Sequence, residues 1–291
     1  NTSYGGEITE LNFAFSAVHQ KKLHIGMSLN FYDLNFSQQS VLTELNSDVD
    51  GTILDVELYQ ENFTTGTGFS ANAGFIYKAH QSFRFGLAYQ TPTWYNEVLQ
   101  DTNYNQDSSI DIGETTFFPE NEETFSEFND RQIISYRLQT PSKLTASTAF
   151  IFGKNGLLSL DYIKKKYQKI KLSNGVFTNE NEHFQNDLKN THNYNIGTEW
   201  RFDRFSVRGG YNFEQTPNTN NFLSDNSVIN FSDIEGYSLG GGYNFGNFKL
   251  DFAYSNNNRT SSYNFYNGFN VESADLTLDN RIFTTTVTLS L

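Results

Sequence analysis

The sequence predicts an all-β protein, a transmembrane antiparallel β-barrel of the outer-membrane type. Three observations predict this fold. Apolar and polar residues alternate through most of the chain, the apolar faces carry almost no charge, and the connections between alternating segments are short and long in turn. A period of two places all the apolar side chains on one face of a strand. The lipid around a barrel requires such a face on every strand.

The composition fits a protein whose apolar side chains face lipid. Hydrophobic residues make up only 37% of the chain, yet aromatic residues reach 16%, with 28 Phe and 17 Tyr. A soluble β-sandwich usually carries more Val, Leu and Ile for its shared core. A membrane barrel needs an apolar residue only at alternate positions, so a mean hydropathy of −0.56 does not exclude it. A soluble antiparallel sheet protein remains the alternative.

Other bulk properties exclude several classes of protein. No run approaches the roughly 18 apolar residues of a transmembrane helix. A net charge of −13 argues against nucleic acid as a partner. The absence of cysteine excludes disulfides and thiolate metal sites. Because the chain starts at Asn1 without a signal peptide, we expect a mature product or a fragment.

Eleven segments carry the strand pattern. The first aligns Leu11, Phe13 and Phe15 on one face. Lipid enforces such a face because Arg or Lys at the bilayer midplane costs about 2–4 kcal/mol. The exceptions are Lys164 and Lys166, near the far end of their strand, where snorkelling or a bulge could accommodate them. The predicted strands are roughly 7–18, 23–36, 63–78, 82–92, 132–152, 156–172, 191–202, 205–216, 236–245, 248–258 and 275–291.

The connections alternate in length. The short ones are "HQKK", "AHQS", "GKNG", "DR" and "GN", and the long polar ones are 37–62, 93–131, 173–190, 217–235 and 259–274. Short turns at one rim and long loops at the other are typical of outer-membrane barrels, whose short turns face the periplasm. Aromatic residues gather at both ends of the apolar faces, which suits the two membrane interfaces.

The direction of the strands predicts a missing part. The first and the last predicted strand both run toward the short-turn rim, so their number is odd. A barrel of this class has an even number of strands and closes without an edge. We therefore expect an N-terminal portion with an odd number of strands to lie outside this chain or to come from elsewhere.

Three of the four prolines stand in Thr-Pro pairs at strand ends, where a residue that cannot donate to the ladder is tolerated. The segments "YRLQTPSKLTASTAFIFGKNGLLSLDYIKKKY", "VRGGYNFEQTPN" and "YSLGGGYNFGNFKLDFAY" resemble successive C-terminal strands of the long-chain fatty-acid outer-membrane transport proteins, the FadL/TodX family. "FRFGLAYQTPTWY" resembles an earlier strand of that family. The resemblance covers about residues 7 to 291, and the style rich in Asn and Tyr resembles a Bacteroidota member.

The resemblance implies a fourteen-stranded barrel with an N-terminal plug. Residues 1–291 would then be a single barrel domain that lacks the plug and three strands. It also implies a location in the outer membrane of a Gram-negative bacterium and diffusion-type uptake of hydrophobic small molecules such as long-chain fatty acids. The alternatives are a structural or docking barrel subunit of a larger outer-membrane secretion or assembly complex and, with less support, a general polar porin.

Two sets of candidate site residues follow. Rings in an exposed acidic loop must be buried against something, and they could capture a hydrophobic ligand or fold the loop onto itself. These candidates are Trp94, Tyr95, Phe117, Phe118, Phe125 and Phe128. The polar residues expected to line the lumen are His24, Arg84, Glu199, Arg201, Arg208, Lys249 and Asp251.

Each of two charged segments can be interpreted in two ways. The 93–130 region holds ten acidic residues and no Lys or Arg. It could bind divalent cations, but it lacks the spacing of a calcium loop, which favours a solvated outer loop. The run "IKKKYQKIK" at 163–171 could bind lipid phosphates, or it could be a solvated strand end.

The sequence predicts no catalytic residues, no metal site and no cofactor, because no histidine stands close to a ligand-like partner. The expected partners are outer-membrane lipids and lipopolysaccharide and a hydrophobic small molecule. Other envelope proteins are expected if the chain is a complex subunit, and nucleic acid is not expected.

Overall fold

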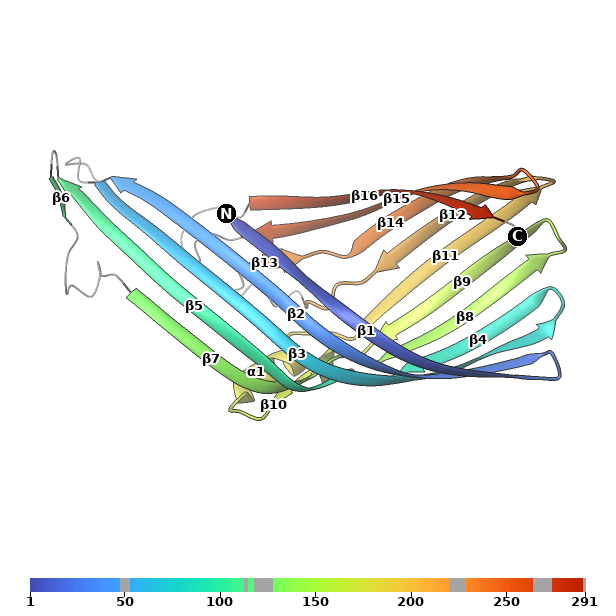
Figure 1. Ribbon diagram of the computed structural model, residues 1–291, viewed down its shortest axis with the longest axis horizontal. Coiled ribbons are helices and arrows are strands. Elements are labelled where there is room, and N and C mark those ends of the chain that lie inside the picture. Colours follow the sequence, from blue (N-terminus) through green and yellow to red (C-terminus); the bar gives the residue numbers. More distant parts are fainter. Residues whose placement is uncertain (48–52, 113–114, 118–127, 220–228, 264–273, 290–291) are drawn as a thin grey trace.

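The computed structural model is a single curved antiparallel sheet (Figure 1). It describes residues 1–47, 53–112, 115–117, 128–219, 229–263 and 274–289. The described strands are β1 (Thr2–His19), β2 (Leu23–Ser47), β3 (Ile53–His80), β4 (Phe83–Gln90), β5 (Trp94–Ile112), β6 (Thr115–Phe117), β7 (Phe128–Gln139), β8 (Lys143–Phe152), β9 (Gly156–Lys165), β10 (Lys171–Ser173), β11 (Thr191–Phe202), β12 (Phe205–Glu214), β13 (Ile229–Phe231), β14 (Ile234–Asn244), β15 (Phe248–Tyr263) and β16 (Ala274–Leu289). A 3-10 turn, η1 (Tyr167–Lys169), and a helix, α1 (Thr178–Asn186), lie between β9 and β11.

The described strands occupy eleven positions across the sheet. We call each position a lane, and a lane holds either one strand or several strands in line. Some lanes contain several strands because the chain breaks and resumes beside the same neighbour: β4 continues into β5, β6 and β7 into β8, β9 into β10, and β13 into β14. Each lane runs antiparallel to the next. The eleven predicted strands therefore match the eleven lanes.

Strand register separates an apolar convex face from a polar concave one. Phe13 pairs with Leu29, which pairs with Ala71, and Phe13 and Leu29 are 52% and 51% exposed. In the next row, Asn30 pairs with Ser70, and these are only 2% and 0% exposed. Side chains diverge on a convex surface and converge on a concave one, so the polar face lies inside. A belt of exposed rings this extensive must meet an apolar environment.

Five short turns lie at one end of the sheet, as predicted (Figure 1). In the first of them Gln20 and Lys21 both have positive φ, +48° and +57°. Two left-handed residues in sequence match the right-handed twist of the flanking strands. None of the helices that the structure describes is long and apolar enough to cross a membrane.

The prediction of long loops at 37–62 and 93–131 was wrong for most of their length. β2 runs to Ser47 and pairs with β3 from Ile53 onward, and β5 continues that sheet to Ile112. At the end opposite the short turns, β2, β3, β5 and β7 therefore extend well beyond the other strands (Figure 1). The backbone hydrogen bonds of neighbouring strands hold these polar segments in the sheet.

Other boundaries also differ from prediction. The predicted strand 132–152 is broken at residues 140–142, and the predicted strand 156–172 stops at Lys165 before η1. The remaining predicted loops are partly structured, since 173–190 contains α1, 217–235 contains β13, and β15 runs through to Tyr263. Proline explains the first break, because it cannot donate to the ladder.

Two neighbouring lanes break at the same level. The chain interrupts β4–β5 at Thr91-Pro92-Thr93 and β7–β8 at Thr140-Pro141-Ser142. The Thr93 N–H donates to the Thr140 side-chain oxygen at 2.9 Å, and the Thr140 N–H donates to the Thr93 carbonyl at 3.0 Å. These two bonds replace the ladder where the prolines interrupt it.

The sheet has two edges. Within the described residues β1 pairs only with β2, and β16 pairs only with β15. Both edge strands run toward the short-turn end, so pairing them directly would give a parallel contact, which barrels of this class do not use.

Candidate functional site

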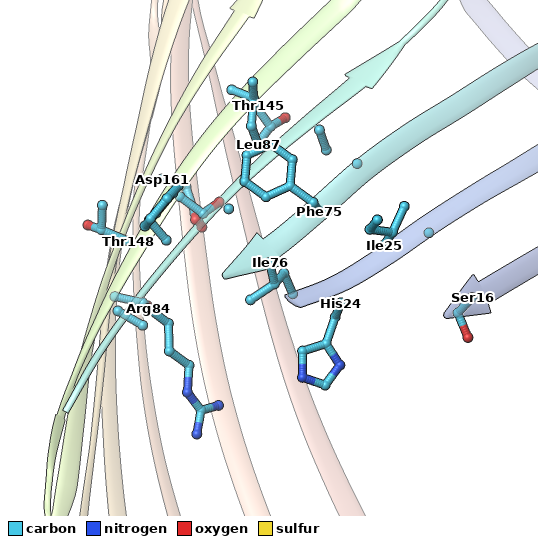
Figure 2. Close-up of a pocket in the computed structure, with 18 residues that line it drawn as sticks. Ser16, His24, Ile25, Phe75, Ile76, Arg84, Leu87, Thr145, Thr148 and Asp161 are labelled. Carbon is cyan, nitrogen blue, oxygen red and sulfur yellow. The ribbon is translucent and has the colours of Figure 1, made fainter. Parts of the chain in front are cut away.

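A pocket of about 620 Å³ lies along β2, β3, β4, β8 and β9 (Figure 2). Most of its lining belongs to the concave face. Small residues leave the space open: Gly26 pairs with Gly74, which pairs with Ala88, and Gly86 lies one row lower. Because these positions lack long side chains, the inner wall is hollowed here.

His24 and Arg84, both predicted to line the lumen, border this pocket. Figure 2 shows their side chains projecting to the same side, with Ile76 between them. Register places His24 opposite Ile76 and Ile76 opposite Gly86, two residues above Arg84 on β4. Ile76 is 52% exposed although it lies on the concave face. The pocket therefore combines apolar contact area with two basic groups.

Sequence reasoning missed Ile76 and Asp161 as pocket residues. Ile76 looked like part of an apolar run, and Asp161 stood among apolar neighbours. The parity of each strand could have placed both on the inner face. Their convergence depends on the register between β3, β4, β8 and β9, which no pattern within one strand specifies.

The other five predicted lumen residues form one ion network. On β12, Arg208 donates through Nε to Glu199 of β11 at 2.8 Å and through Nη1 to Asp251 of β15 at 2.7 Å. Arg201 pairs with Glu199 at 2.6 Å, and Lys249 pairs with Asp251 at 3.0 Å. Each carboxylate is shared by two cations, so the network ties together the wall from β11 to β15.

Glycines on β14 make this network possible. β14 lies between β12 and β15, and Gly240 and Gly242 occupy its inner face opposite Arg208 and Asp251. A Cβ at Gly242 would overlap the Asp251 carboxylate. Further up, Asn212 donates to Asn257 at 3.1 Å across Gly236. Because these glycines have no side chains, side chains of β12 and β15 can contact each other across β14.

The first two aromatic candidates lie on opposite faces. Trp94 packs beside Phe69 of the convex face, with ring centroids 5.2 Å apart, at the level where the apolar band ends. This position is that of an interfacial tryptophan. Tyr95 points inward, is 7% exposed, and lies 6.5 Å from the ring of Tyr32.

The remaining aromatic candidates that the structure describes do not lie near Trp94 and Tyr95. In the strand register Phe128 pairs with Gln106, eleven residues beyond Tyr95 on β5, which is about 36 Å along a strand. Phe117 pairs with Ile110, still further out. Phe118 and Phe125 lie outside the described residues. The six rings therefore do not form one cluster around Tyr95.

Polar groups close the inner face beside Tyr95. The Asn30 amide donates to the Tyr32 hydroxyl at 3.2 Å and to Ser70 at 3.3 Å, and Asn12 donates to Asn30 at 2.5 Å. Nearby, the Tyr136 hydroxyl donates to Gln100 at 3.3 Å. These bonds connect Asn12, Asn30, Tyr32 and Ser70 in one group and Tyr136 to Gln100.

Within the residues that the structure describes, no three His, Cys, Asp or Glu side chains gather closely enough to hold a metal ion. One acidic residue of the 93–130 region has a cationic partner instead. Arg131 donates through Nε and Nη2 to Asp101, at 2.9 and 2.6 Å. The hydrogen bond from Arg131 lowers the pKa of the Asp101 carboxyl below its usual range.

No protein-family model and no curated protein matches the chain in sequence. Solved structures match its fold. The CymD monoaromatic hydrocarbon channel has a TM-score of 0.59 at 13% identity, covering 98% of this chain and 76% of that one. A FadL homologue of Pseudomonas aeruginosa has a TM-score of 0.62 at 15% identity, covering 99% and 68%. The deltaS2S3 mutant of the TodX monoaromatic hydrocarbon channel has a TM-score of 0.53 at 12% identity, covering 86% and 64%.

The convex apolar band and the all-antiparallel sheet define the fold of an outer-membrane β-barrel. Its fold is that of the FadL/TodX hydrocarbon channels, in agreement with the resemblance in sequence. The Bacteroidota origin remains a prediction.

Proposed function

We propose that the protein takes up hydrophobic small molecules across the outer membrane by diffusion, with long-chain fatty acids among its substrates. The pocket of about 620 Å³ in the inner wall carries this proposal. Its volume lies in the usual range for small-molecule sites, which combine apolar lining with a few polar groups. The structural neighbours include monoaromatic hydrocarbon channels, which supports the same class of solute.

The inner residues would have distinct roles. Ile76 and the glycine-lined wall would contact the apolar body of the solute, and Arg84 and His24 would meet a polar end if it has one. Tyr95 would contact solute nearer the entrance. We assign Trp94 to the lipid interface and not to the ligand.

We also propose that three further strands and a plug complete the barrel. The two unpaired edges of the described sheet support this, because unpaired backbone groups facing lipid each cost several kcal/mol. The odd number of lanes points the same way. Lipopolysaccharide and other outer-membrane lipids would be its surroundings.

The experiment is solute flux into proteoliposomes that contain the full-length protein. We expect flux of a radiolabelled long-chain fatty acid and of a monoaromatic hydrocarbon, and none of a sugar of similar size. Gly26→Leu fills the pocket without a backbone clash, since its Cβ would lie 3.9 Å from the nearest atom, the Phe15 carbonyl oxygen. It should reduce flux of both solutes. Gly241→Leu on the convex face, where a Cβ would also be in ordinary contact at 3.8 Å, is the matched control.

Two results would contradict the proposal. Equal flux of sugar and hydrocarbon would indicate a general porin. Native purification that yields stoichiometric partner proteins and no bound lipophile would instead support a docking subunit of a larger complex.

A further inference from the structure

Five basic residues gather on two adjoining lanes near the upper membrane boundary, which is the one farther from the short turns. Arg137 lies on β7, Lys164 on β9, Lys166 and Lys169 at η1, and Lys171 on β10. In a chain with 20 Lys and Arg and a net charge of −13, this concentration is unusual. We call these five residues the basic patch.

Register places the three strand residues of the patch on the convex face. Lys164 pairs with Leu144 and with His192, both on the lipid-facing side. Leu172 pairs with the inward-facing Leu138, so its neighbour Lys171 points outward.

Arg137 is also exposed and lies opposite Ser173, two residues from Lys171. Along β7 and β8, five residues separate the partners of Lys164 and Lys171, about 16 Å of strand. A surface of this length can contact more than one anionic group.

The level of the patch coincides with the upper aromatic belt. Tyr162, two residues below Lys164, packs beside Tyr194 with ring centroids 5.5 Å apart. Its hydroxyl lies 2.6 Å from Nδ1 of His192. Tyrosine at this depth sits at the headgroup level. The short-turn end faces the periplasm in this class, so the patch lies at the headgroups of the outer leaflet.

The charges of the patch have no ion-pair partner among the described residues, although other cations of the wall do. Inside, Arg208 and Lys165 are paired with Glu199 and Glu214. Outside, Arg131 and Arg281 are paired with Asp101 and Asp279. None of the described ion pairs includes a residue of the patch, and Glu180 and Glu182 of the nearby α1 form none with it.

We propose that the basic patch binds the phosphate groups of an anionic glycolipid in the outer leaflet. Lysine and arginine at the end of an apolar strand can extend to the headgroups while their stems contact acyl chains. A lipid is the fitting partner because the patch continues the lipid-facing surface of Leu144 and Tyr162. This inference depends on the membrane location and not on which solute crosses the barrel.

The test measures binding of diphosphorylated lipid A to the purified full-length protein by native mass spectrometry, with dephosphorylated lipid A as the comparison. The triple variant Arg137→Gln/Lys164→Gln/Lys171→Gln should lose about 100-fold in affinity, given the usual gain per cation near an anionic surface. The variant Lys22→Gln/Lys78→Gln/Lys154→Gln removes the same charge at the short-turn end and should bind like the wild type. Lys164→Arg/Lys171→Arg should also retain binding, which guards against a folding defect in the first variant.

Equal losses in the two Gln variants would overturn the proposal, because net charge and not the patch would then govern binding. Equal affinity for phosphorylated and dephosphorylated lipid would also overturn it. So would stoichiometric capture of an acidic protein at the patch in place of lipid.

Discussion

Gly241 and Gly242 are neighbours on β14 that should respond oppositely to the same substitution. Gly241 lies on the convex face, where an added Cβ would be 3.8 Å from the nearest atom, the carbonyl oxygen of Ser206. At Gly242 the Cβ would overlap the carboxylate of Asp251 and lie 2.7 Å from the Ser206 hydroxyl. Alanine therefore fits at 241, and at 242 it displaces the side chain that Arg208 holds.

Two contributions determine how much the two substitutions differ in their effect on the free energy of unfolding. Gly→Ala at a compatible position stabilises by about 0.4–1 kcal/mol, because the unfolded chain loses freedom. A hydrogen bond to a charged group contributes about 1.5–3 kcal/mol, and the lower end applies here because Arg208 is about one-third exposed. Gly241→Ala should thus raise the free energy of unfolding by about 0.5 kcal/mol and Gly242→Ala should lower it by about 1 kcal/mol.

The assay is equilibrium urea unfolding of the protein in lipid vesicles, with linear extrapolation to zero denaturant. In an Asp251→Ala background only the contact with the Ser206 hydroxyl remains, so most of the penalty of Gly242→Ala should disappear, a coupling that a double-mutant cycle measures. Equal effects of the two glycine substitutions in the wild-type background would refute the reasoning. So would an unchanged penalty at 242 in the Asp251→Ala background.

Three further predictions concern the region above the membrane and its boundary. The Arg131 hydrogen bond lowers the pKa of Asp101, so the stabilisation from this ion pair is present above the usual carboxyl pKa and is lost as pH falls through the lowered value. Hydrogen-exchange protection of the paired strands β5 and β7, corrected for the intrinsic exchange rate at each pH, should therefore fall in acid, and less so in Asp101→Asn. Thr140→Val removes the acceptor of the Thr93 N–H and should cost about 1–3 kcal/mol in urea unfolding. Fluorescence of Trp94 should be quenched by lipids brominated near the headgroup and little by lipids brominated at the chain ends.

Each of these predictions has its own control. Thr148→Val on the convex face loses no hydrogen bond that the structure describes and should leave stability unchanged. The quenching measurement uses Trp200→Phe, because the chain has only two tryptophans. A pH response that persists in full in Asp101→Asn, or strong quenching of Trp94 at the bilayer centre, would contradict the corresponding assignment.

The membrane-spanning part of the fold could be predicted because lipid imposes a signal on each strand. From Leu23 to Phe31 every second residue is apolar, and the structure places that series on the convex face. Above the membrane, no lipid requires an apolar residue at alternate positions. From Asp101 to Asp107 both faces of β5 are polar, so no period of two marks the strand, and only its pairing with β3 identifies it.

The candidate site shows the same division. The parity of each strand was enough to assign His24, Arg84 and Arg208 to the inner face. It could not show that His24 and Arg84 border one pocket while Arg208 belongs to a separate ion network, because that depends on register between strands distant in sequence. The open path over β14 depends likewise on which residues of β12 and β15 lie beside its glycines.

The length of β2 determines where a solute first meets this protein. Its 25 residues span about 80 Å at roughly 3.3 Å each, and a tilt near 45° makes this a height of about 57 Å. Since the apolar band takes up about 25 Å, the wall formed by β2, β3 and β5 rises roughly 30 Å above the lipid. A hydrophobic solute of the proposed kind would therefore first meet the protein in the aqueous medium, well outside the lipid, and the wall would lead it toward the membrane.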